Sequence, residues 1–259
     1  MSDVPDLPSS RLRRATPARI GLGRAGAGMP TAPMLEFQMA HALARDAVQT
    51  PLDADALAAT LVQAGFPSPL LLATGAGDRT TYLARPDLGR RLDQASRLLL
   101  KDRGTTACDV ALVIADGLSA TAVESHAPAL VRALQMRLTG WNWAPIGIVR
   151  QGRVAVGDEI GALLSADLVL VLIGERPGLS SPDSLGAYLT WAPRIGRSDA
   201  ERNCVSNIRP PHGLTPDQAA DKLAWLMTQA RRRRLTGTAL KDEHAALPPS
   251  PATLDAPEG

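Results

Sequence analysis

The chain has 259 residues, of which 45% are hydrophobic and 3% aromatic, as expected for one large domain, or a domain with an extension, whose core is mainly Leu, Ala and Val. Its 28 basic and 26 acidic side chains leave a net charge of +2, so composition does not indicate a nucleic-acid partner. Because the sequence contains neither a membrane-length apolar run nor a secretory signal at its polar start, we expect a soluble cytoplasmic protein that does not bind a membrane.

Residues 1–33 are rich in Arg, Pro and Gly and lack a periodic apolar pattern, so they are predicted to form an extended arm. Residues 21–26 match the glycine fingerprint of dinucleotide sites, which requires a strand before it and a helix directly after it. The preceding residues do not resemble a buried strand, and Pro30 and Pro33 delay a helix. A stand-alone nucleotide-binding oxidoreductase that uses residues 21–28 is therefore the weaker alternative. An arm that lies on a partner subunit explains this composition better.

The segment 34–105 is predicted to form a smaller, mainly helical N-terminal lobe. Apolar periodicity predicts helices over residues 34–48, 52–64 and 87–101. Gly65 follows the second helix, at the position where glycine commonly ends a helix. Two short strands are expected at residues 70–73 and 81–83.

From residue 106 to residue 240 the pattern alternates between strand and helix. Strands are predicted at residues 110–115, 146–149, 168–173 and 203–208, with a short extended piece at 153–156. Helices are predicted at residues 120–138 and 158–164, and another begins at Pro216 after a capping box. This alternation indicates an α/β fold with a Rossmann-like open, mainly parallel sheet. The remaining residues, 241–259, have low complexity and are predicted to be disordered.

The strand at residues 168–173 is an unbroken apolar run, typical of a strand buried on both faces. Glu175 and Arg176 follow it, and open α/β sheets bind ligands beyond the carboxyl ends of their strands. Residues 153–154 and 203–204 lie near other predicted strands. These three segments, 153–154, 175–176 and 203–204, offer hydrogen-bonding groups and apolar surface, but they do not contain a complete set of catalytic residues. This combination favours a domain that holds a large polar ligand. The alternative is that the Glu175–Arg176 turn is solvated and has no function.

The sequence predicts neither a catalytic residue nor a metal site. Cys108 and Cys204 lack metal-ligand spacing, and the four histidines are scattered. Cys204 is either a small buried strand residue or a contact residue, because a nucleophile would need a base that the sequence does not identify. The four arginines at 231–234 are interpreted as cations at a helix C-terminus rather than as a phosphate site.

Several motifs resemble, in the same order, those of the small (light) chain of ethanolamine ammonia-lyase. The resemblance covers roughly residues 11–240, and it rests on residues 16–26, 82–92, 114–119, 152–161, 174–179 and 202–208. Several long motifs in one order are far more specific than any one of them.

This resemblance implies an adenosylcobalamin-dependent carbon–nitrogen lyase that converts ethanolamine to acetaldehyde and ammonia through a substrate radical. It implies a hetero-oligomer in which a large barrel-shaped chain binds the substrate and carries most catalytic groups. The small chain would close over the corrin ring at the interface and be active only with its partner. Carried over by motif, the cobalamin-contacting positions are Val154, Glu175 and Cys204, which belong to the same three segments.

Two further expectations accompany the resemblance. The sequence lacks the Asp-x-His-x-x-Gly motif of proteins that bind cobalt through their own histidine, so the cofactor should keep its own base as lower ligand if this chain is the only candidate to supply one. Some family members carry a longer N-terminal extension that targets a bacterial microcompartment, and the short extension here favours the cytoplasm. A purely structural interaction subunit is the remaining alternative.

Overall fold

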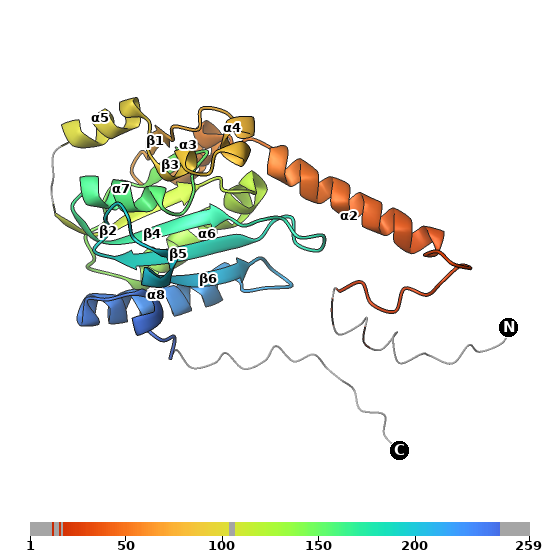
Figure 1. Ribbon diagram of the computed structural model, residues 1–259. Coiled ribbons are helices and arrows are strands. Elements are labelled where there is room, and N and C mark those ends of the chain that lie inside the picture. The colour runs from red at the N-terminus through yellow and green to blue at the C-terminus, as the bar shows by residue number, and fades with distance from the viewer. Residues whose placement is uncertain (1–11, 13–15, 17, 104–106, 244–259) are drawn as a thin grey trace, which may run out of the picture.

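A six-stranded sheet with helices on both faces forms the centre of the computed structural model, which describes residues 12, 16, 18–103 and 107–243 (Figure 1). The spatial order of the strands is β1-β3-β2-β4-β5-β6. Their bounds are Leu70–Ala73 (β1), Cys108–Ala115 (β2), Gly147–Arg150 (β3), Ala166–Gly174 (β4), Leu185–Trp191 (β5) and Arg202–Ile208 (β6).

Four of the strands, β1, β3, β2 and β4, are parallel, and β5 and β6 extend the sheet in antiparallel fashion. The apolar run predicted at 168–173 is the centre of β4, and its residues are buried on both faces. The predicted α/β class and mainly parallel sheet are thus confirmed. Strand β5 was missed, and the Rossmann-like topology stays a prediction.

Helices α6 (Ala120–Arg137) and α8 (Pro216–Arg233) cover one face of the sheet along most of its width, and α3 (Ala54–Gln63) covers the part near β3. Val123, Leu130 and Leu134 of α6 are fully buried in this layer. Each such side chain contributes about 1.5–3 kcal/mol of transfer free energy. Leu185, Ala187 and Leu189 bring β5 into the same layer, which anchors the antiparallel extension to the core.

The opposite face is covered only in part. Helices α5 (Gln94–Asp102) and α7 (Val156–Leu163) pack over β1, β2 and β4 on this side (Figure 1). On β5 and β6 the side chains of Tyr188, Cys204 and Ser206 point the same way and are half-buried or exposed. We call this part of the sheet, defined by Tyr188, Cys204 and Ser206, the open face.

Helix α2 (Thr31–Gln49) projects from the body of the protein (Figure 1). It begins at Thr31, three residues before the predicted start, and buries only Ala40, Ala44 and Ala47. Its larger apolar side chains are exposed; they are Met34, Leu35, Phe37, Met39 and Leu43. An exposed apolar surface of this kind is typical of an interaction site.

Two local predictions were wrong. The strand expected at 81–83 lies in helix α4 (Arg79–Ala84), because Asp78 accepts hydrogen bonds from the Thr81 N–H at 2.9 Å and its hydroxyl at 2.7 Å. This N-terminal cap outweighs the strand preference of Thr and Tyr. The extended piece expected at 153–156 is instead a turn that leads into α7 at Val156.

The helix expected at 87–101 is divided into a short 3-10 helix, η1 (Leu88–Arg90), and α5, which starts after the capping residue Asp93. Strand β1, within the segment 34–105, pairs with β3 in the main sheet, and the domain boundaries stay a prediction. Most of the predicted disordered tail, 244–259, and most of the predicted arm before residue 18 lie outside the described residues. No helix in the described part of the chain is long and apolar enough to cross a membrane.

Candidate functional site

One of the three predicted contact residues, Cys204, belongs to the open face, and the other two, Val154 and Glu175, lie beside it. Glu175 directly follows β4, Val154 lies in the turn before α7, and Cys204 is in β6. Val154 and Glu175 line one hollow of about 410 Å³, together with Tyr188 of β5. Cys204 is the direct cross-strand partner of Tyr188. The fold therefore brings together residues that are up to 50 positions apart in the sequence.

The Glu175 carboxylate is held in place by three donors, one from Ser184 directly before β5 and two from β6. The Ser184 hydroxyl donates to one oxygen at 2.6 Å, the Asn207 N–H donates to the same oxygen at 3.3 Å, and the Ser206 hydroxyl donates to the other. Below it lies Gly186, where a Cβ atom would be 2.9 Å from a carboxylate oxygen. A carboxylate has about four acceptor positions. Glu175 is therefore oriented and still has capacity for one more donor.

Cys204 is exposed, which contradicts the buried strand residue considered from the sequence. The surrounding protein raises the pKa of its thiol by desolvation, and the charge of Glu175 raises it further against an opposing hydrogen bond from the Tyr188 hydroxyl. Desolvation also raises the pKa of Tyr188. Both groups are consequently neutral at physiological pH, and a neutral thiol is a poor nucleophile.

The hollow is also lined by the buried ring of Tyr82, which contacts two guanidinium groups. The Cζ atom of Arg153 is 4.1 Å from the ring centroid, and that of Arg79 is 4.8 Å from it. Such contacts are attractive because the ring face is electron-rich. The Tyr82 hydroxyl donates to the Gly152 carbonyl at 3.1 Å, which fixes the turn that carries Arg153 and Val154.

The floor of the hollow depends on a close approach between the ends of β2 and β4. Gly117 has a φ of +56°, and a Cβ atom there would overlap the Gly174 carbonyl oxygen. Asp116, one residue earlier, accepts hydrogen bonds at 2.9 Å from the N–H groups of Gln151 and Gly152. Burial raises the pKa of Asp116, and these two donors oppose the shift. The motif at 114–119 therefore positions the turn before α7.

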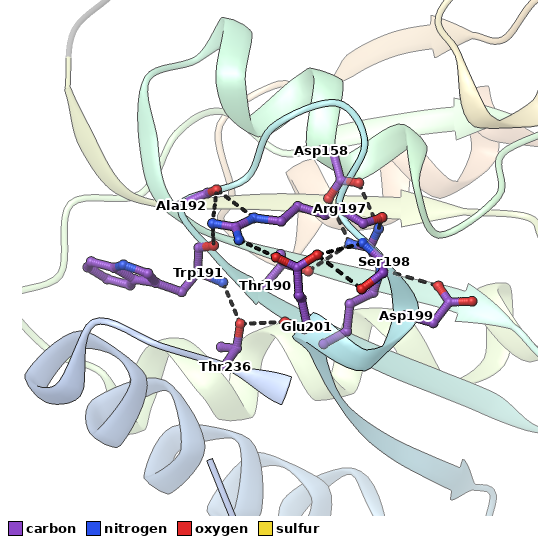
Figure 2. Close-up of polar contacts among 10 residues, drawn as sticks. Asp158, Thr190, Trp191, Ala192, Arg197, Ser198, Asp199, Glu201 and Thr236 are labelled. Atoms are coloured by element: carbon purple, nitrogen blue, oxygen red, sulfur yellow. Dashed lines mark hydrogen bonds and ion pairs between the residues drawn. The ribbon is translucent and has the colours of Figure 1, made fainter. Parts of the chain in front are cut away.

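The loop 192–201 between β5 and β6 is fastened from within (Figure 2). The Arg197 guanidinium donates to the carbonyls of Trp191 at 3.1 Å and Ala192 at 2.9 Å, and it pairs with Glu201. The Ser198 N–H and hydroxyl donate to the same carboxylate at 2.8 and 3.0 Å. These donors lower the pKa of Glu201 to about 2, the N–H of Ser198 having the largest effect.

A buried ion pair connects this loop to α7. Arg202 donates to both oxygens of Asp158 at 2.7 Å, to the Thr190 hydroxyl at 2.9 Å and to the Arg197 carbonyl at 3.0 Å. Burial by itself would lower the pKa of Arg202, but the hydrogen bonds and charge of Asp158 raise it. Burial raises the pKa of Asp158, and the hydrogen bonds from Arg202 oppose that shift. The pair connects the loop to the first turn of α7.

A second hollow, of about 580 Å³, lies between this loop and the start of α7. It shares Arg153 and Val154 with the first hollow, so the two adjoin. Its other lining residues are Pro86, Arg90, Arg91, Ala155, Asp158, Ile195, Gly196, Arg197, Ser198 and Asp199.

The sequence is similar to known proteins along almost its full length. The family model described as "Ethanolamine ammonia-lyase light chain (EutC)" matches residues 7–241. The chain belongs to this family. The ethanolamine ammonia-lyase small subunit of Azotobacter vinelandii is 56% identical over 247 residues, covering 93% of this chain and 91% of that protein. Those of Xanthomonas campestris pv. campestris strain B100 and Pseudomonas aeruginosa strain PAO1 are 56% and 55% identical, covering 90% of this chain and 87% and 86% of theirs.

As a member of the ethanolamine ammonia-lyase family, the chain is part of a carbon–nitrogen lyase. Among the residues that the structure describes, no group of three or more His, Cys, Asp or Glu side chains is placed to hold a metal ion. The neutral Cys204 thiol beside a neutral phenol is not a nucleophile–base pair. The residues around the open face are thus equipped to bind and orient a ligand.

Sequence reasoning missed two aromatic residues of this site, Tyr82 and Tyr188. For Tyr188 a signal was present, since Leu185, Ala187 and Leu189 alternate with it as in a half-buried strand. Tyr82 gave no comparable signal, because its contacts with Arg79 and Arg153 depend on the tertiary fold.

Proposed function

We propose that this small subunit holds adenosylcobalamin against the large subunit of ethanolamine ammonia-lyase, and that the assembled enzyme converts ethanolamine to acetaldehyde and ammonia. The observation that carries the proposal is the position of Val154, Glu175 and Cys204 beside one open face and one hollow. These residues form a single wall. A cofactor on it would need the large subunit to supply the opposite wall and bind the substrate.

The chemistry of this wall fits the cofactor. Cobalamin has a flat, largely apolar ring edged with amide side chains. Val154 and Cys204 offer apolar contact, and Gly186 keeps the space below Glu175 free of a side chain. The remaining acceptor position of Glu175 suits an amide N–H or a ribose hydroxyl. When bound, the cofactor would supply the cobalt–carbon bond whose cleavage starts radical chemistry, while this chain binds, orients and excludes water.

The proposal also accounts for the absence of acid–base chemistry on the wall. Tyr188 and Cys204 have raised pKa values and stay protonated, so they bring no charge close to the ring. The sequence contains no Asp-x-His-x-x-Gly motif, so we propose that this chain supplies no lower ligand and that, if it is the only candidate, the cofactor keeps its own base.

Glu175→Gln tests the cofactor assignment. The amide keeps the size of the side chain but loses the charge and converts an acceptor into a donor. We expect the dissociation constant for cobalamin, measured by titration of the assembled complex, to rise about 10- to 100-fold. Glu36→Gln, which removes an exposed carboxylate from α2, is the matched control and should leave binding unchanged. Unaltered affinity in a correctly assembled Glu175→Gln complex would refute the assignment.

Whether this chain needs the large subunit for activity is tested by assaying each chain separately, and then both together, with ethanolamine and adenosylcobalamin. We expect acetaldehyde and ammonia from the mixture alone. Turnover by this chain without its partner, at a rate near that of the mixture, would place the active site here and refute the proposal.

A further inference from the structure

The second hollow is rich in arginine. Arg90, Arg91, Arg153 and Arg197 line it, and Arg153 also lines the first hollow. Its volume of about 580 Å³ is within the usual range of small-molecule sites. Of the three wall residues described above, Val154 lines this hollow, and Glu175 and Cys204 do not.

Most of the opposing charge in this hollow is already neutralised. Asp158 is bound by Arg202 at 2.7 Å, and both side chains are 2% exposed. The other lining carboxylate, Asp199, is 97% exposed and lies 3.5 Å from Arg202. The Arg197 guanidinium is already occupied, because it donates hydrogen bonds within its own loop and to the end of β5, to Glu201, Ala192 and Trp191 (Figure 2).

The remaining three arginines are largely uncompensated. Arg91 is 3.5 Å from Glu159, but that carboxylate is bound more closely by Arg97, at 2.7 Å. Within the described ranges, neither Arg90 nor Arg153 has a carboxylate within ion-pair distance. The Nε atom of Arg153 is buried and lacks a hydrogen-bond partner. The hollow consequently carries net positive charge, which favours an anion.

We propose that this hollow receives the phosphodiester of the nucleotide loop of cobalamin, an inference that rests on the proposed function. The loop extends from the edge of the corrin ring, and its phosphodiester is the one ionised group at the edge of the molecule. The hollow adjoins the proposed ring-binding wall through Arg153 and Val154. Guanidinium groups suit phosphate because their planar donors can form two parallel hydrogen bonds.

Three corrinoids test this assignment on the assembled complex. Cobalamin has the whole nucleotide loop, cobinamide phosphate has a phosphate without the nucleoside, and cobinamide has neither. In the double variant Arg90→Gln, Arg91→Gln, we expect cobalamin and cobinamide phosphate to bind about 10- to 100-fold more weakly. Cobinamide should bind as it does to the unaltered complex, because it has no phosphate to lose contact with.

Arg194→Gln is the matched control, since it removes an exposed cation from the same loop outside the hollow and should not affect any of the three affinities. Equal weakening of all three corrinoids, or of none, in the double variant would overturn the phosphodiester assignment and leave the proposed function in place. If the double variant assembled more weakly, while the complex that did form discriminated among the three corrinoids as the unaltered one does, the arginines would meet carboxylates of the large subunit instead, and the assignment would also be overturned. An unaltered complex that binds no corrinoid would refute the proposed function itself.

Discussion

Replacing Asp158 by Asn should strongly destabilise the protein, because it removes the buried counter-ion of the buried Arg202 guanidinium and leaves only Asp199, which is 3.5 Å away and 97% exposed. The two side chains are each 2% exposed, and the carboxylate receives two hydrogen bonds of 2.7 Å from Arg202. Breaking a buried pair on one side costs about 3–5 kcal/mol. For a chain of this size that corresponds to a fall in the melting temperature of roughly 6–20 °C.

The measurement is thermal and urea unfolding of the purified chain, followed by circular dichroism. Arg85→Ala is a matched control, since Arg85 and Asp87 are also 2.7 Å apart but are 60% and 58% exposed. Exposed pairs contribute only about 0–1 kcal/mol. The double variant Asp158→Leu, Arg202→Met removes both charges and should recover much of the loss. If Asp158→Asn were no more destabilising than Arg85→Ala, burial would not be the cause and the reasoning would fail.

Two predictions concern the open face. Gly186→Ala places a Cβ atom 2.9 Å from a Glu175 oxygen, so it should displace the carboxylate. We expect it to weaken cobalamin binding about as much as Glu175→Gln does. If the titration with cobalamin were unchanged, the position of the carboxylate would be unimportant for binding. Cys204 is exposed, but it should react slowly with iodoacetamide at pH 7.5 and faster as the pH rises above 9. The reason is that only the thiolate reacts, and the pKa of this thiol is raised. Rapid labelling at neutral pH would contradict this prediction.

The parts of the fold that local pattern determines were predictable. Three expected strands, at 110–115, 168–173 and 203–208, lie within the observed strands β2, β4 and β6, and their ends differ from the observed ends by at most two residues. Continuous apolar runs and the capping box before α8 are signals within a few residues of sequence, and tertiary contacts here reinforce them.

Strand β5 was missed for a physical reason. It follows a stretch of Pro, Ser, Asp and Gly without strand character, and its apolar alternation is short and includes Gly186, which has low strand preference. Its antiparallel direction arises because it returns beside β4 without a crossover helix, and no local signal encodes that choice.

The site was predictable to different degrees. Glu175 lies where the strand-end rule places a ligand contact, because β4 ends at Gly174. Cys204 does not follow that rule: it lies within β6, and only the reversal of β5 brings it across from Tyr188 and close to Glu175. Whether these residues contact a cofactor stays a prediction.

The open face is part of the main sheet, and this has a thermodynamic consequence for whatever binds there. Tyr188 and Cys204 are held opposite each other by the backbone hydrogen bonds of β5 and β6, while α6 and α8 support the sheet from behind. These groups lose their conformational freedom when the chain folds, before any ligand arrives. A ligand seated on such a surface spends little of its binding free energy on ordering the protein. Contacts made there should accordingly contribute more affinity than the same contacts made by a flexible loop.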